Sequence, residues 1–169
     1  MNTFKIQVIV VQKRMEIQIR KVKLEVFWLI CTAFGAFVFL LPIKIYQIQY
    51  PFWISNVCYI FGAITCSRWF FLWKYTPYAW NIPLKIAFIG ILFIAFILGF
   101  DRFHHFKYLI NDIGIQELVQ HLPVQEQDKL AMFIRSEMIF WATAFFGSTI
   151  VLVPKIFWSI WKQVNRNEV

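Results

Sequence analysis

Charged side chains are scarce in this chain of 169 residues: they make up 15% of it, while 60% of the residues are hydrophobic. A soluble domain of this size needs far more polar surface to stay in solution. Acidic residues are scarcer still, because nine Asp and Glu stand against seventeen Lys and Arg, for a net charge of +8. The composition excludes an ordinary soluble domain and predicts a membrane protein.

Catalytic signatures are also missing. The sequence has no HExxH, GxSxG, Walker or CxxC pattern, and no histidine stands four to six residues after an arginine, as HEPN nucleases require. No two carboxylates fall within one apolar stretch, so the usual relay of a proton-coupled transporter is missing too. We therefore expect a protein that is not an enzyme and needs no cofactor.

Only three cysteines occur, Cys31, Cys58 and Cys66, and each lies in an apolar stretch. A disulfide framework normally uses an even number of cysteines placed in extracellular loops. We expect these three to be small buried hydrophobic residues.

Four apolar stretches take up most of the chain, and each has about the 20 residues that a helix needs to cross a bilayer. They are residues 24–43, 52–73, 82–100 and 138–161. One bundle of this kind uses the whole chain, so we predict a single all-α, polytopic membrane domain over residues 1–169 with four transmembrane helices. Lys85 lies at the start of the third stretch, and we expect its amine to extend to the lipid headgroups.

The basic residues indicate the orientation of the four predicted spans. One side holds twelve of the seventeen, which are Lys5, Lys13, Arg14, Arg20, Lys21, Lys23, Arg68, Lys74, Lys85, Lys155, Lys162 and Arg166. Cytoplasmic loops carry the excess of Lys and Arg, so we expect both termini in the cytoplasm. Because most bases flank spans, we expect no direct binding of nucleic acid.

Two segments outside the spans have helical patterns. Residues 1–23 alternate in part as a strand does, but they also carry a helical apolar stripe, and we favour a basic amphipathic helix on the inner leaflet. Residues 101–137 are expected outside the cytoplasm as an amphipathic helical loop, broken at Gly114. A new helix is expected to begin at Pro123 and to continue into the fourth span.

Small residues recur at intervals of four in two spans: Cys58, Gly62 and Cys66 in the second, and Thr143 with Gly147 in the fourth. Such faces let helix backbones approach closely within a membrane. They indicate either packing inside one bundle, which we favour, or an interface between subunits.

Charged and titratable groups form two further candidate sites, one inside the membrane and one in the outer loop. Arg68 is an intramembrane charge, which is a functional candidate by default, although an arginine near the end of a span usually extends to phosphates. Four residues of the outer loop, Asp101, His104, His105 and His121, are candidates for a sensor of external conditions. Adjacent histidines on a helix diverge, so we expect no metal site there.

The layout of four spans, both termini inside and small soluble parts, resembles the membrane subunit (KwaA) of the bacterial Kiwa antiphage system. The resemblance covers most of the chain, in architecture alone. It implies a component of a defence complex that detects membrane disturbance during infection and works with a cytoplasmic protein partner. The expected partners are therefore the lipid bilayer, further copies of this chain in a homo-oligomer, and a soluble cytoplasmic protein.

Two other functions stay open. Immunity proteins against pore-forming bacteriocins have a similar size, span count and orientation, and they pack against the toxin's helices in the bilayer. An oligomeric channel is the third reading, although no span carries a polar stripe that could line a wet pore.

Overall fold

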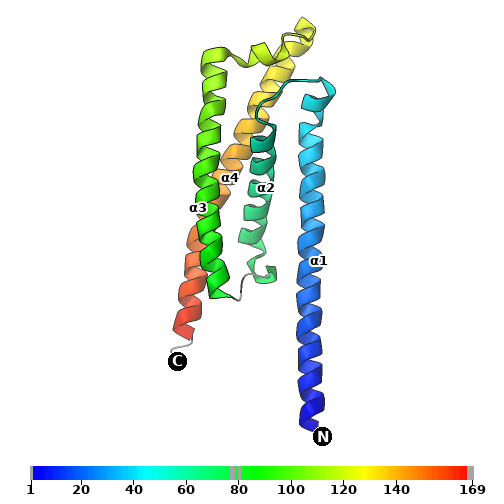
Figure 1. The fold of residues 1–169 in the computed structure, drawn as a ribbon, viewed down its shortest axis with the longest axis vertical. Helices are drawn as coiled ribbons and strands as arrows, with labels where there is room; N and C mark the ends of the chain where they lie inside the picture. The colour runs from blue at the N-terminus through cyan, green and yellow to red at the C-terminus, as the bar shows by residue number, and fades with distance from the viewer. Residues whose placement is uncertain (1, 77–78, 80, 167–169) are drawn as a thin grey trace.

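The structure is a computed structural model that describes residues 2–76, 79 and 81–166, and it is helical throughout its long elements. Four helices run antiparallel to their sequence neighbours (Figure 1): α1 (Asn2–Ile45), α2 (Trp53–Phe71), α3 (Ile82–Tyr108) and α4 (Val124–Arg166). The described residues contain no strand, which confirms the all-α prediction. Among the described residues, three segments are long and apolar enough to cross a membrane: Met15–Ile45, Ile82–Asp112 and Val124–Asn165.

The remaining helix, α2, is the shortest of the four and lies among the others (Figure 1). It packs mainly against α4, less against α1 and least against α3. Its buried side chains are Asn56, Tyr59, Ile60, Ala63 and Cys66. Because protein rather than lipid surrounds much of α2, this helix can carry polar residues that an isolated membrane span could not.

The outer surfaces of the other helices are apolar. In α3 the buried side chains are Lys85, Leu92 and Phe106, whereas Phe93 and Ile94 are 65% and 59% exposed. Soluble proteins rarely expose apolar surface on this scale. These faces suit contact with lipid, as the prediction of a membrane protein requires.

The first helix buries side chains against the bundle in its second half. Its buried side chains are Thr32, Ala36, Leu40 and Ile43, which repeat at helical spacing on one face. Residues 2–23 continue the same helix beyond the end of α2 (Figure 1). The helical prediction for this segment is confirmed, but the segment lies in line with the rest of α1, whereas the sequence favoured a helix lying on the inner leaflet. We call residues 2–23 the arm.

The connection between α3 and α4 is shorter than the sequence suggested. Residues 101–108 extend α3, and residues 124–137 are the first turns of α4. Between them lie a π-helical turn, η3 (Leu109–Ile113), and a 3₁₀ helix, η4 (Ile115–Val119). Gly114 joins the two at φ 89°, a conformation that residues with a side chain rarely adopt. The predicted break at Gly114 and the start after Pro123 are both confirmed.

Both chain ends lie at one end of the bundle, together with the connection from α2 to α3, which includes η1 (Trp73–Tyr75) (Figure 1). We call this the terminal end. Residues 46–52 and 109–123 lie at the opposite end, which we call the loop end.

Gly62 allows α2 to approach α4, and this makes a first prediction. A Cβ atom at Gly62 would lie 2.4 Å from the ring of Phe145, so Gly62→Ala should destabilise the bundle by about 1–3 kcal/mol through overpacking. Gly90→Ala is the control, because nothing lies within 4 Å of a Cβ there. Thermal unfolding in detergent should show a lower Tm for Gly62→Ala alone. Equal Tm values for the two variants would contradict this packing.

Candidate functional site: polar contacts of α2 and a groove beside it

A cluster of four buried polar residues joins α2 to α4 near the loop end. The side-chain amide of Asn56, which is fully buried, donates to a carboxylate oxygen of Glu137, which is 6% exposed. Tyr50, in the turn before α2, lies near enough to Glu137 to feel its charge, and the buried Trp141 follows Glu137 by one turn of α4. We call these four residues the Asn56 cluster. A buried polar pair of this kind is strong where water is excluded, because the local dielectric is low.

The Asn56 cluster keeps unused hydrogen-bonding capacity. Four of its buried atoms have no hydrogen-bond partner among the described residues: the Tyr50 hydroxyl, Asn56 Oδ1, Glu137 Oε1 and Trp141 Nε1. Burial, followed by the neighbouring charge of Glu137, raises the pKa of the Tyr50 hydroxyl far above its ordinary value. Tyr50 therefore stays protonated and offers an O–H donor beside the carboxyl group.

At the terminal end, three basic side chains join the helices in pairs. Arg68 of α2 forms an ion pair with Glu25 of α1. Lys155 of α4 donates to the backbone oxygen of Phe70, at the end of α2, and lies 4.3 Å from the centre of the Phe70 ring. A cation at a helix C-terminus is favourable, because the last carbonyl groups carry partial negative charge.

The third of these side chains is Lys85, and its position shows that the prediction made for it was wrong. Lys85 is 1% exposed, and its amine donates to Ser159 Oγ at 2.9 Å and to Gln163 Oε1 at 2.8 Å. It was expected to extend to lipid headgroups, but its amine is held inside the bundle by two polar residues of α4. The sequence could not show this, because Ser159 and Gln163 lie more than seventy residues further along the chain.

Arg68, the predicted intramembrane charge, also has a protein partner. Its side chain is 9% exposed and its guanidinium lies against Glu25, so it joins α1 to α2. The expected extension to lipid phosphates is not what the structure shows. A charge that is paired inside the bundle serves the packing of α1, which has few other contacts with the rest of the protein.

The small-residue candidates separate into two groups. Gly62 and Cys66 lie inside the chain's own bundle, Gly62 against Phe145 and Cys66 buried beside the hydroxyl of Thr149. Cys58 is exposed, contrary to the expectation that all three cysteines are buried, and Cys31 is exposed too. Thr143 and Gly147 are exposed on the outer face of α4, and no atom lies within 4 Å of a Cβ at Gly147.

The outer-loop candidates do not form one site. Asp101 and His105 share a face of α3, with 3.9 Å between Asp101 Oδ2 and His105 Nε2, and both are exposed; His104 is exposed as well. His121 lies instead on the connection to α4, where its Nε2 atom is 3.0 Å from the backbone oxygen of Tyr46. No three His, Cys, Asp or Glu side chains gather as metal ligands in the described part of the chain.

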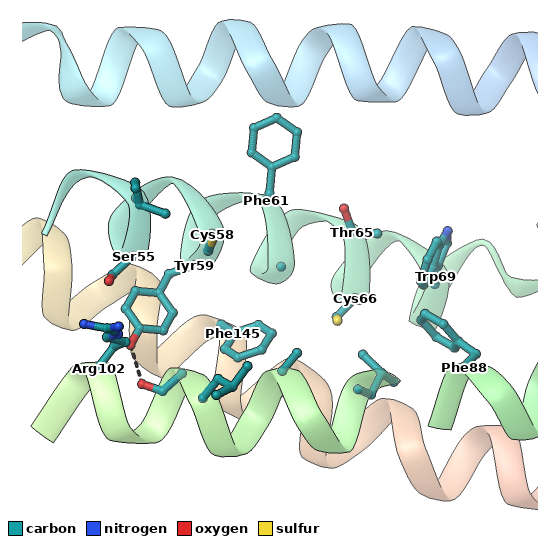
Figure 2. Close-up of a pocket in the computed structure, with 16 residues that line it drawn as sticks. Ser55, Cys58, Tyr59, Phe61, Thr65, Cys66, Trp69, Phe88, Arg102 and Phe145 are labelled. Atoms are coloured by element: carbon teal, nitrogen blue, oxygen red, sulfur yellow. Dashed lines mark hydrogen bonds between the residues drawn. The ribbon is translucent and has the colours of Figure 1, made fainter. Parts of the chain in front are cut away.

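A long groove opens between α2 and α3 (Figure 2). Phe145 of α4 forms its floor. Its volume is about 490 Å³, within the usual range for ligand pockets. The lining is apolar along most of its length, with Trp69 and Phe88 at one end and Ser55, Tyr59 and Arg102 at the other (Figure 2). The Tyr59 hydroxyl donates to the backbone oxygen of Gly99 and so joins the two walls.

The sequence prediction missed Glu137, which was placed in an outer loop. A signal was present, because Ile134, Met138, Trp141 and Phe145 repeat at helical spacing and Glu137 lies on the same face. Its partner, Asn56, lies on α2, so this hydrogen bond joins two helices.

The chain matches no known protein family, no curated protein sequence and no solved structure.

The Asn56 cluster yields a second prediction. Asn56→Leu should cost about 3 kcal/mol, because it leaves the buried Glu137 carboxylate without its donor. Replacing both residues, as Asn56→Leu with Glu137→Leu, should recover most of that loss, since an apolar pair needs no partner. Glu126→Leu, on the exposed first turn of α4, is the control for the loss of a carboxylate. The measure is the unfolding free energy in detergent, and additive losses in the double variant would contradict the direct contact.

Proposed function

We propose that this chain is a non-enzymatic, four-span component of the bacterial inner membrane, with both termini in the cytoplasm, whose arm docks a soluble protein. The length of α2 supports the fourth span. Its 19 residues extend about 28 Å, close to the 30 Å thickness of the hydrocarbon layer. Two of its polar side chains, Asn56 and Arg68, have partners on other helices, which favours their placement inside a membrane.

The position of the chain ends supports the orientation. Both lie at the terminal end of the bundle (Figure 1), which is also where Arg68, Lys85 and Lys155 lie. An even number of crossings brings the two ends to one side of the membrane, and the excess of basic residues favours the cytoplasmic side.

The arm is the observation that carries the docking proposal. Residues 2–23 add about 33 Å of helix beyond the part of α1 that packs on the bundle. The arm holds six bases and one acid, Glu16, and its described apolar residues Met15, Ile17 and Ile19 are at least half exposed. A basic helix with an apolar component suits an acidic groove on a soluble partner. The resemblance to the Kiwa membrane subunit supplies the proposed setting, an antiphage defence complex.

The orientation can be tested with reporters at the two tails. Fusions of a fluorescent protein that folds only in the cytoplasm should be bright at both the N-terminus and the C-terminus. Fusions of a phosphatase that is active only outside the cytoplasm should be inactive at both, and active when inserted after Gly114. Reporters that place the two tails on opposite sides would contradict the four crossings.

The docking role of the arm is tested by removing exposed charge from it. The double variant Arg20→Gln with Lys23→Gln should lose a soluble protein that co-purifies with the wild-type chain in mild detergent, because the charge attraction is removed. The matched control is Lys107→Gln with Arg135→Gln, two exposed bases of α3 and α4 outside the arm. Loss of the protein in the control, or its retention in the arm variant, would contradict docking by the arm.

A further inference from the structure

The groove between α2 and α3 has one charged end. Arg102 lies at the end nearest the loop end of the bundle, beside Ser55 and Tyr59 (Figure 2). The adjacent acid, Asp101, lies instead near His105 on another face of α3. Within the part of the chain that the structure describes, no acidic side chain lies at salt-bridge distance from Arg102. Its guanidinium is exposed and available to an external anion.

The rest of the groove has the length and polarity of a hydrocarbon chain. Along α3 the lining runs from Arg102 to Phe88, fourteen residues apart, which is about 21 Å of helix. One leaflet of the hydrocarbon layer is about 15 Å thick, so the groove can hold a lipid chain along its whole depth. Leu92, Ala95 and Leu98 supply an apolar wall between the two ends.

Two glycines hold the groove open at its floor. A Cβ atom at Gly62 would lie 2.4 Å from the Phe145 ring, and one at Gly99 would lie 3.2 Å from the same ring and 3.3 Å from that of Tyr59. Because Gly62 and Gly99 have no side chains, the Phe145 ring can lie against both α2 and α3, and the Tyr59 ring can lie against α3. The groove is therefore a consequence of how α4 packs beneath the two helices.

We propose that this groove binds one phospholipid with an anionic headgroup, whose phosphate pairs with Arg102 and whose acyl chain lies between α2 and α3. The positive charge of Arg102 at the rim favours an anionic headgroup, and the apolar lining of the groove accommodates the acyl chain. Asp101 and Arg102 end the uncharged run of α3, which places the rim at headgroup depth. The proposal requires α2 and α3 to lie in a membrane, but it does not depend on the partner docked by the arm.

Native mass spectrometry of the detergent-purified protein, titrated with phosphatidylglycerol or phosphatidylcholine, measures this binding directly. One phosphatidylglycerol should be retained about tenfold more tightly than phosphatidylcholine, because the choline cation of phosphatidylcholine offsets the phosphate charge that attracts Arg102, whereas phosphatidylglycerol keeps a net negative charge. Arg102→Ala should remove this preference and Arg102→Lys should restore part of it. Lys107→Ala, an exposed base of the same helix outside the groove, should leave it unchanged.

Two more measurements locate the lipid. Ala95→Trp should fill the groove and abolish retention, while reporters at the two tails still show the normal orientation. Bound phosphatidylglycerol should slow the reaction of Cys58, which lines the groove, with a maleimide, and it should leave Cys31 on α1 unaffected.

The proposal is overturned by equal retention of both lipids, by wild-type retention in Arg102→Ala, or by an unprotected Cys58. A protein dimer that Ala95→Trp dissociates would also overturn it, since a second copy would then occupy the groove.

Discussion

Hydrocarbon cannot satisfy a polar side chain, and α2 places several of them where a membrane helix would meet hydrocarbon. Each of the two most costly ones has a partner on a neighbouring helix: Asn56 meets Glu137 of α4, and Arg68 meets Glu25 of α1. A polar residue on α2 therefore determines which helix lies beside it and at what height. The arrangement of the bundle depends on this requirement more than on apolar contacts, because lipid offers apolar contacts equally well.

The other features follow from a central polar helix surrounded by apolar ones. Because α4 supplies most of the contacts to α2, the second and third helices touch little, and the groove opens between them. The first helix joins the bundle through one apolar stripe and one ion pair, so its first half is left as the arm. The headgroup of a lipid held in the groove and a protein held by the arm would thus lie at opposite ends of one bundle. This arrangement suits a protein that reports on the state of the membrane to a soluble partner.

Much of the helical framework could be predicted, because helix length, apolar runs and breaks at Gly114 and Pro123 are local properties of the sequence. The partners of buried polar groups could not, since they depend on contacts between distant segments. Lys85 is the clearest case: it is an end-of-span base by position, and yet Ser159 and Gln163 hold it inside. The helix that contains Glu137 was expected, because a helix was predicted to begin at Pro123 and to continue into the fourth span. The role of Glu137 was missed because its partner, Asn56, lies 81 residues earlier in the chain. The groove follows from the packing of α4 under two glycines, which no single helix pattern indicates.

The central claim is that α2 buries one face against the other helices, and the accessibility of spin labels in liposomes tests it most directly. Single labels on α2 at Ile60 and Ala63, both buried, should be poorly accessible to oxygen dissolved in the bilayer. Labels on α3 at Ile94 and Ile97, both exposed, should collide with oxygen freely. High oxygen accessibility at Ile60 and Ala63, equal to that at Ile94 and Ile97, would show that α2 faces lipid and would contradict the account.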